Sequence, residues 1–206
     1  MQGRGVAWAT QLPSGSAVVV RNSRHGGRLA WITRDFFLAP TRAPRELATA
    51  VRLAAEGVPT PEVVAYAVYG GAGPLHRSDV ATAQVDGVDF PSAWAAMPGR
   101  AERDAMLDAV AALLRGLQAS GAWHQDLNVR NVLVSRAGGA MTAWVLDVDR
   151  VVFHARGDPG VALRNARRLA RSLAKWRALK QLDLGEDQLR RLLAAAGVGA
   201  FAGVAP

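Results

Sequence analysis

Two apolar stretches in the second half of the chain carry polar residues that a buried strand would not select. Residues 123–134 read WHQDLNVRNVLV, and residues 143–153 read AWVLDVDRVVF. The segment between them contains SRAGGAMT, whose adjacent glycines favour a hairpin turn. The pattern therefore predicts a polar loop, a strand, a tight turn and a second strand that brings the chain back to the loop.

This hairpin would bring Asn131 and Asp147 to the same end of the strand pair. An amide oxygen and a carboxylate that meet there suit Mg²⁺, a hard cation that takes few protein ligands and keeps several waters. Asp126, in the loop before Asn131, is placed to accept the proton of an attacking hydroxyl. This division of roles is typical of phosphoryl transfer, in which positioning and charge neutralisation supply most of the catalysis.

The same residues match the spacing of the protein-kinase signature H-R-D-L-x-x-x-N, except that its arginine is missing. The matching residues are His124, Gln125, Asp126, Leu127 and Asn131. The later D-F-G triplet is represented by Asp147, Val148 and Asp149. The alternative is that His124 and Asp126 only cap a turn and that Asp147 is an exposed hairpin residue. Two motifs in the right order favour the kinase interpretation.

The first part of the chain contains candidates for the groups that hold ATP phosphates. A kinase places a basic residue on a small-lobe strand and pairs it with a glutamate on the next helix. No lysine precedes Lys175, but Arg21 ends the predicted strand AVVVR and Glu46 lies on the following predicted helix. Such a pair can hold phosphates, whereas the alternative is that Arg21 is an ordinary surface arginine. The candidate phosphate-covering turn consists of Gly3, Arg4 and Gly5. Residues 24–27, RHGG, form a second candidate anion-binding loop.

Hydrophobic periodicity places most strands early in the chain and most helices late. The predicted strands include residues 5–11, 16–21 and 79–86, and the predicted helices include residues 41–57, 101–119 and most of the chain after about residue 160. This order predicts an α+β fold with two lobes. The small N-lobe, residues 1–86, would be an antiparallel sheet with one helix. The C-lobe, residues 87–206, would be mainly helical and would carry the catalytic and metal-binding loops.

Composition narrows the class of protein. Half of the residues are hydrophobic, so the chain can form a sizeable core. No apolar run reaches the roughly 18 residues of a membrane span, and the N-terminus lacks the order of a signal peptide, so we expect a cytoplasmic protein. Cysteine is absent, which excludes disulfides and thiolate metal sites. The net charge of +8 favours polyanionic partners such as nucleotide phosphates, nucleic acid or an acidic membrane.

The sequence resembles one family over most of residues 3–175, namely the 3-deoxy-D-manno-octulosonic-acid (Kdo) kinases of the lipopolysaccharide core, which have a protein-kinase-like fold. The resemblance includes HQDLNVRNVLV and LDVDR, and also GRGVAW, VVRNSRHGGRLAWITRDFF, TRAPRELATAVRLAAEGVPTPE and NARRLARS. It implies transfer of the ATP γ-phosphate to a hydroxyl of Kdo attached to lipid A. It also implies a location at the cytoplasmic face of the inner membrane.

The resemblance also implies a role for each candidate residue. Asp126 would be the catalytic base, and Asn131 and Asp147 would bind Mg²⁺. Asp149 would either bind a second metal or pair with Arg150. Arg21 and Glu46 would form the small-lobe pair, as the family has an arginine at this strand position. His124 would support the catalytic loop, and Asn128 stands where protein kinases often have a lysine that contacts the transferred phosphate.

Three alternatives remain open on the sequence. A kinase of the same fold could act on heptose, another small molecule or a protein, and it would share every catalytic residue. A pseudokinase is disfavoured by Asp126, Asn131 and Asp147. The charge alone would also fit a non-catalytic nucleic-acid-binding protein, although no motif of that class occurs.

A basic face is predicted on the helix near residues 162–180. It would consist of Arg164, Arg168, Arg171 and Lys175. This face either binds a phosphorylated lipid acceptor and anionic headgroups or is simply the solvated side of a packed helix.

Overall fold

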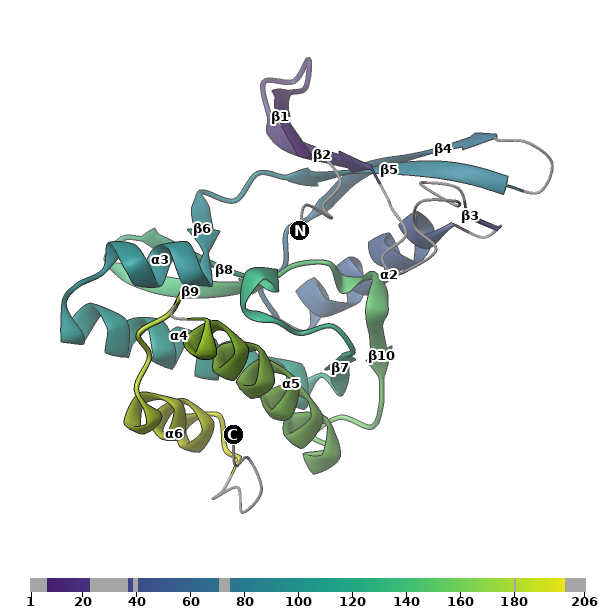
Figure 1. Ribbon diagram of the computed structural model, residues 1–206. Helices are drawn as coiled ribbons and strands as arrows, with labels where there is room; N and C mark the ends of the chain where they lie inside the picture. The colour runs from purple at the N-terminus through teal and green to yellow at the C-terminus, as the bar shows by residue number, and fades with distance from the viewer. Residues whose placement is uncertain (1–6, 23–36, 39–40, 71–74, 180, 199–206) are drawn as a thin grey trace. The chain divides into compact units, whose positions relative to one another are not determined.

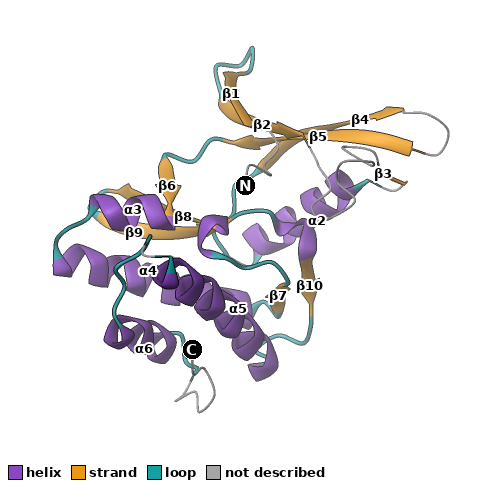
Figure 2. Ribbon diagram, in the orientation of Figure 1, coloured by secondary structure: helices purple, strands orange, loops and turns teal. Residues whose placement is uncertain are grey.

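A computed structural model of the chain describes residues 7–22, 37–38, 41–70, 75–179 and 181–198. These residues form two compact units. The first contains the chain up to Arg52 together with Pro61–Val85, and the second contains Leu53–Thr60 together with the chain from Asp86 onward. Strands dominate the first unit and helices the second, as Figures 1 and 2 show.

The first unit is an antiparallel sheet with β5 at its centre. Its strands are β1 (Ala7–Gln11), β2 (Ala17–Asn22), β3 (Phe37–Leu38), β4 (Val63–Gly70) and β5 (Leu75–Ala83). β5 pairs with β2, β3 and β4, and β1 pairs with β2. Val18 on β2 and Val80 on β5 are both buried. Val18 pairs with Ala83 and Val80 pairs with Arg21, so the two side chains point to opposite faces of the sheet.

Helix α2 (Arg42–Ala55) follows β3 and lies mostly in the first unit. Ala43, Glu46, Ala50 and Leu53 recur at helical spacing and are all buried, so one face of the helix is covered. The helix ends just before Gly57, whose φ of 72° is a conformation that favours glycine.

The second unit is built around helix α4 (Arg100–Ala119), which packs against β9, α5 and α6. The other helices are α3 (Phe90–Ala96), α5 (Pro159–Ala178) and α6 (Glu186–Ala195), with the 3₁₀ turns η1 (Val129–Asn131) and η2 (Val148–Arg150). The strands form a three-stranded sheet of β6 (Gly87–Asp89), β8 (Val132–Ala137) and β9 (Ala140–Val145), and a pair of β7 (Ala122–His124) and β10 (Val151–Phe153). The buried face of α4 consists of Met106, Leu107, Val110, Ala111, Leu113, Leu114 and Leu117.

The predicted α+β class is confirmed, and the predicted elements are found with small shifts at their ends. The helix expected at residues 101–119 is α4, and the strand expected at residues 79–86 is β5, which begins and ends earlier. The predicted hairpin is the β8–β9 pair, with Gly138 and Gly139 at its turn. The short strands β6, β7 and β10 were not predicted, since three residues are too few to display periodicity.

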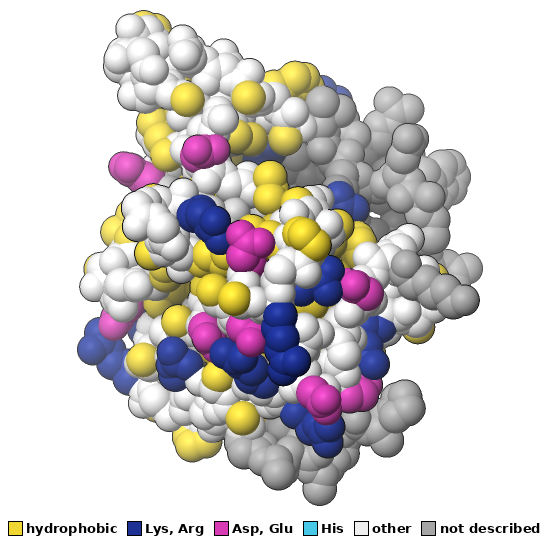
Figure 3. Space-filling model, turned by 90° about the vertical axis from the view of Figure 1, so that its left-hand side faces the viewer, with side chains coloured by type: hydrophobic (Ala, Val, Ile, Leu, Met, Phe, Trp, Pro, Cys, Tyr) yellow, Lys and Arg dark blue, Asp and Glu magenta, His cyan; other side chains and the backbone are white. Residues whose placement is uncertain are grey.

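Basic and acidic side chains are interspersed on the face of the molecule that Figure 3 shows. In the second unit, several arginines have an acidic partner on the surface. The pairs are Arg103–Asp183, Arg136–Glu102, Arg177–Glu186, Arg190–Asp187 and Arg191 with Asp104 and Asp108. In the ranges that the structure describes, no helix is both long enough and apolar enough to cross a membrane.

Candidate active site

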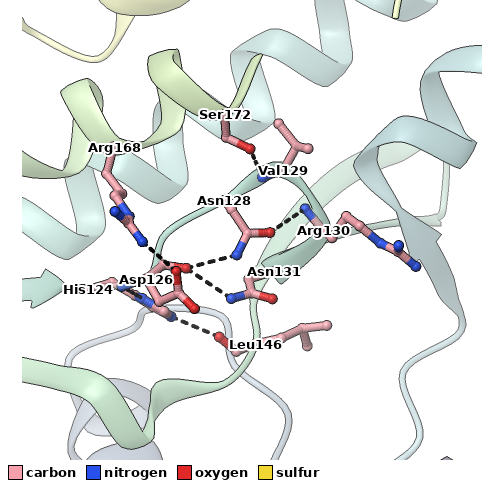
Figure 4. A network of polar contacts seen from close by, with 9 residues as sticks. All are labelled: His124, Asp126, Asn128, Val129, Arg130, Asn131, Leu146, Arg168 and Ser172. Atoms are coloured by element: carbon pink, nitrogen blue, oxygen red, sulfur yellow. Dashed lines mark hydrogen bonds and ion pairs between the residues drawn. The ribbon is translucent and has the colours of Figure 1, made fainter. Parts of the chain in front are cut away.

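The predicted catalytic loop runs from β7 through η1 and is closed on itself by side-chain hydrogen bonds (Figure 4). The backbone carbonyl of Asp126 accepts hydrogen bonds from Asn128 Nδ2 at 3.0 Å and from Asn131 Nδ2 at 2.9 Å. Asn128 Oδ1 in turn accepts from the N–H of Arg130 at 3.0 Å and caps the start of η1. Both asparagines therefore fix the loop around the peptide group of Asp126.

The hairpin brings Asn131 and Asp147 to one end, as its turn and strand pattern predicted. Val132 on β8 lies opposite Val145 on β9, and the N–H of Leu146 donates to the carbonyl of Asn131 at 2.9 Å. Asp147 is the next residue. Its φ of 55° and ψ of 49° are left-handed, and it is the one described non-glycine residue with positive φ. A side chain held in this costly conformation is a feature of functional sites.

His124 links the catalytic loop to the segment that carries Asp147. Its Nδ1 accepts the N–H of Asp126 at 3.2 Å, and its Nε2 lies 2.9 Å from the carbonyl of Leu146. The ring proton is therefore assigned to Nε2, and the imidazole is neutral. Burial lowers the pKa of His124, although the Leu146 carbonyl and then the nearby carboxylates, Asp147, Asp126 and Asp149, act to raise this pKa. A neutral imidazole suits a structural link rather than proton transfer.

Helix α5 holds the catalytic loop through Asn165 and Ser172, for which the sequence predicted no role. Asn165 is fully buried, where its Oδ1 accepts the N–H of His124 at 3.0 Å and its Nδ2 donates to the carbonyl of Ala122 at 2.8 Å. Ser172 Oγ accepts the N–H of Val129 at 3.2 Å. Seven residues separate Asn165 from Ser172, so both lie on one side of the helix.

Arg168 lies on the same side of α5 and forms an ion pair with Asp126. Its Nη2 is 2.6 Å from Asp126 Oδ1, and the two side chains are 42% and 39% exposed. Arg164, one turn earlier, pairs with Asp158 and stacks over Trp123. Two of the four residues of the predicted basic face, Arg164 and Arg168, therefore form ion pairs with carboxylates of the second unit. Arg171 and Lys175 are exposed.

In the first unit, Arg21 on β2 forms an ion pair with Glu46 on α2. The Glu46 side chain is 6% exposed and that of Arg21 is 30% exposed. A buried carboxylate requires such a partner, so the pair fixes the helix to the sheet. Gly3, Arg4 and Gly5, proposed to cover phosphates, and residues 24–27 lie outside the described residues.

The predicted metal ligands fit a hard cation by their chemistry. Asn131 donates through Nδ2 to the Asp126 carbonyl, so its Oδ1 is the end of the amide left for a ligand. Asp147 adjoins it across the hairpin, and Asp149 is half-buried in η2. Within the described ranges no group of three or more His, Asp or Glu side chains could hold a metal ion. One amide oxygen with two carboxylates is an oxygen-only set of the kind Mg²⁺ uses.

The α+β fold and the catalytic and metal-loop motifs define a phosphotransferase of the protein-kinase-like class. A model of the lipopolysaccharide kinase (Kdo/WaaP) family matches residues 1–195. The chain belongs to this family and is an ATP-dependent kinase, which removes the nucleic-acid-binding alternative.

Curated relatives of this chain bear the name 3-deoxy-D-manno-octulosonic acid kinase. One from Xylella fastidiosa (strain 9a5c) is 29% identical over 194 residues, which cover 92% of this chain and 74% of the relative. One from Stenotrophomonas maltophilia (strain K279a) is 31% identical over 195 residues, which cover 91% of this chain and 74% of the relative.

A solved structure, described as WaaP in complex with acyl carrier protein, has a similar fold. Its TM-score is 0.62 at 19% sequence identity, and the match covers 95% of this chain and 78% of that one. This likeness supports the fold alone.

Proposed function

We propose that this kinase phosphorylates a hydroxyl of Kdo in the inner core of lipopolysaccharide, with a Kdo–lipid A molecule as acceptor. The observation that carries the proposal is the similarity, along more than nine tenths of the chain, to relatives named for this activity. The arrangement of Asp126, Asn131 and Asp147 around one end of the β8–β9 hairpin supports the chemical part of the proposal.

In the proposed reaction, the acceptor hydroxyl oxygen attacks the γ-phosphorus of ATP. A new oxygen–phosphorus bond forms, the bond from the γ-phosphorus to the β-phosphate oxygen breaks, and ADP leaves with that electron pair. The hydroxyl proton passes to the carboxylate of Asp126, as in other kinases. Both ends of the Asn128 amide are bonded within the loop, so Asn128 would contact the transferred phosphate through the second N–H of its Nδ2 group. His124 acts as a positioning residue because both of its ring nitrogens are already bonded.

Mg²⁺, bound by Asn131 and Asp147 with Asp149 as a further ligand, would neutralise charge on the phosphates. The Arg21–Glu46 pair would contact the ATP phosphates, since a guanidinium can bind phosphate oxygens while its other N–H groups hold a carboxylate. Gly3, Arg4 and Gly5 would cover the phosphates with backbone N–H groups.

A lipid-linked acceptor requires the enzyme to work at a membrane surface, which we place at the cytoplasmic face of the inner membrane. The exposed Arg171 and Lys175 on α5 are candidates for contact with anionic headgroups. This contact would be peripheral and dependent on salt.

The proposal is tested by transfer of labelled γ-phosphate from ATP with Mg²⁺. Three acceptors are compared: a Kdo–lipid A precursor, the same lipid without Kdo, and a core acceptor in which heptose is the free sugar. We expect labelling that requires Kdo. Asp126→Asn should lower this labelling about 100- to 10,000-fold, the usual contribution of a general base. Asp187→Asn, the same change at a side chain 90% exposed on α6, is the matched control. Labelling of the heptose acceptor alone would assign the enzyme to that substrate instead.

A further inference from the structure

Only one nitrogen of the Arg168 guanidinium has a partner among the described residues. Its Nη2 contacts Asp126 Oδ1 at 2.6 Å, and no other hydrogen bond of Arg168 or of the Asp126 carboxylate joins it to the described residues. A guanidinium carries five N–H groups, so the side chain retains donors beside the carboxylate it already holds. Asp126 Oδ2 likewise remains for the acceptor hydroxyl. Both side chains are about two fifths exposed, so a ligand can reach them.

The backbone that carries Arg168 is held against the catalytic loop. Arg168 lies between Asn165 and Ser172 on α5, and these two residues bind the backbone of His124 and Val129 on either side of Asp126. Leu169 and Ala170, next to Arg168, are buried and fix the helix in the core. The fold therefore fixes the backbone of Arg168 beside the catalytic loop, and the ion pair with Asp126 orients its side chain.

The negative charge around the site suits Arg168 to a second role, in addition to its ion pair with Asp126. Asp126, Asp147 and Asp149 are all close enough to His124 to act on its charge. Asp147 and Asp149 would be neutralised by the proposed Mg²⁺, but Asp126 would still repel an anionic acceptor unless a fixed cation met the negative group of that acceptor. Arg168 is the cation that the structure places directly beside Asp126. Its planar fork matches a carboxylate with two parallel hydrogen bonds, which a lysine could not provide.

We propose that Arg168 recognises the carboxylate of a sugar-acid acceptor, holding that group while a hydroxyl of the same sugar ring meets Asp126 Oδ2. This inference rests on the proposed function, because Kdo is a sugar acid and carries a carboxylate. It makes Arg168 a determinant of acceptor specificity, since a neutral heptose offers no group for it. Arg168 would contact the acceptor and leave the affinity for ATP unchanged.

The test compares two acceptors with each enzyme: the Kdo–lipid A precursor and its carboxamide, which has nearly the same shape without the charge. For the wild type, we expect the carboxamide to lower kcat/KM about 10- to 100-fold, the loss typical of a charge-assisted hydrogen bond. For Arg168→Gln, the two acceptors should differ less than about threefold. KM for ATP should not change. Arg168→Lys, which keeps the charge and disturbs folding least, should give an intermediate ratio. Arg190→Gln, an exposed arginine on α6, is the control and should behave like the wild type.

The ratio of kcat/KM for the two acceptors distinguishes recognition of the acceptor carboxylate by Arg168 from positioning of Asp126 by Arg168. If Arg168 only orients Asp126, the substitution slows both acceptors equally and the ratio stays at its wild-type value, which overturns the proposal. An unchanged ratio in Arg168→Lys together with a raised KM for ATP would overturn it as well and assign the side chain to the nucleotide. A wild-type enzyme without activity on either Kdo acceptor would overturn the proposed function itself. This result is distinct from the two outcomes above, which overturn only the role of Arg168.

Discussion

Asn165 and His124 are joined by a buried hydrogen bond in which the side-chain oxygen of Asn165 accepts the backbone N–H of His124 at 3.0 Å. The other end of the same amide donates to Ala122 at 2.8 Å. One side chain thus bonds to the backbone on both sides of Trp123, just before the catalytic loop begins.

Replacement of Asn165 by leucine should be among the most damaging changes in the second unit. It leaves the N–H of His124 and the carbonyl of Ala122 buried without partners, at a cost of about 2–4 kcal/mol in the free energy of unfolding. Ser172→Ala removes one hydrogen bond of the same loop at a half-buried position and should cost about 1 kcal/mol. Urea unfolding of both variants measures the difference. Equal costs would contradict the view that Asn165 is the principal anchor.

The neutral state of His124 makes folding stability depend on pH. Burial lowers the pKa of this residue below its usual 6.5, so the unfolded chain binds a proton more readily than the folded one. The stabilisation is complete above about pH 6.5 and decreases as the pH falls below that value toward the folded-state pKa. Between pH 7.5 and 5.5, the wild type should lose more stability than His124→Gln, by at most about 1.4 kcal/mol, as measured by urea unfolding at both pH values. Parallel curves for the two proteins would show that folding does not lower the pKa of His124.

Asp147 should be replaced more easily by glycine than by alanine, although either change removes the proposed metal ligand. The residue has a φ of 55°, a conformation that costs a residue with a Cβ about 1 kcal/mol and costs glycine nothing. Asp147→Gly should therefore unfold at a higher urea concentration than Asp147→Ala, with both variants inactive in phosphate transfer. A more stable alanine variant would mean that the left-handed conformation is not retained at this position.

Gly121 is required for a close backbone approach between the end of α4 and the segment after β10. A Cβ at this position would lie 2.4 Å from the carbonyl oxygen of His154 and 2.8 Å from that of Ala155. Gly138, at the hairpin turn, also has positive φ, but a Cβ there would meet nothing within 4 Å. Gly121→Ala should cost at least about 2 kcal/mol more than Gly138→Ala, because the clash adds to a backbone strain common to both. Thermal unfolding of the two variants measures this difference in stability. Equal melting temperatures would argue against the close contact at Gly121.

Much of the second unit could be predicted from local patterns. The glycines at the β8–β9 turn and the alternation beside them fix the register, and the register places Asn131 beside Asp147. The apolar spacing of α4 was equally informative, since it predicted the helix and its seven buried residues recur at helical spacing. Patterns of this kind are read over a few residues and do not depend on the rest of the fold.

The contributions of α5 could not be predicted in the same way. Asn165 and Ser172 lie about 40 residues beyond the loop they hold. They are the first and last residues of NARRLARS, a segment that belongs to the family resemblance but does not by itself show what its side chains bind. A further signal was a polar Asn165 beside the apolar Ala166 and Leu169, which the structure buries. Arg168 was grouped with neighbouring basic residues because a helical projection shows which residues share a side and does not show what that side faces.

The β8–β9 hairpin separates its turn from its functional end. Gly138 and Gly139 occupy the turn with open space around them, while Asn131 and Asp147 flank the other end, roughly 20 Å away at the usual rise of a strand. The chain contains no cysteine. A cysteine introduced at this turn would be the only thiol in the molecule, so a fluorophore or spin label could be attached there selectively and could report binding to lipid vesicles while leaving the catalytic end unmodified.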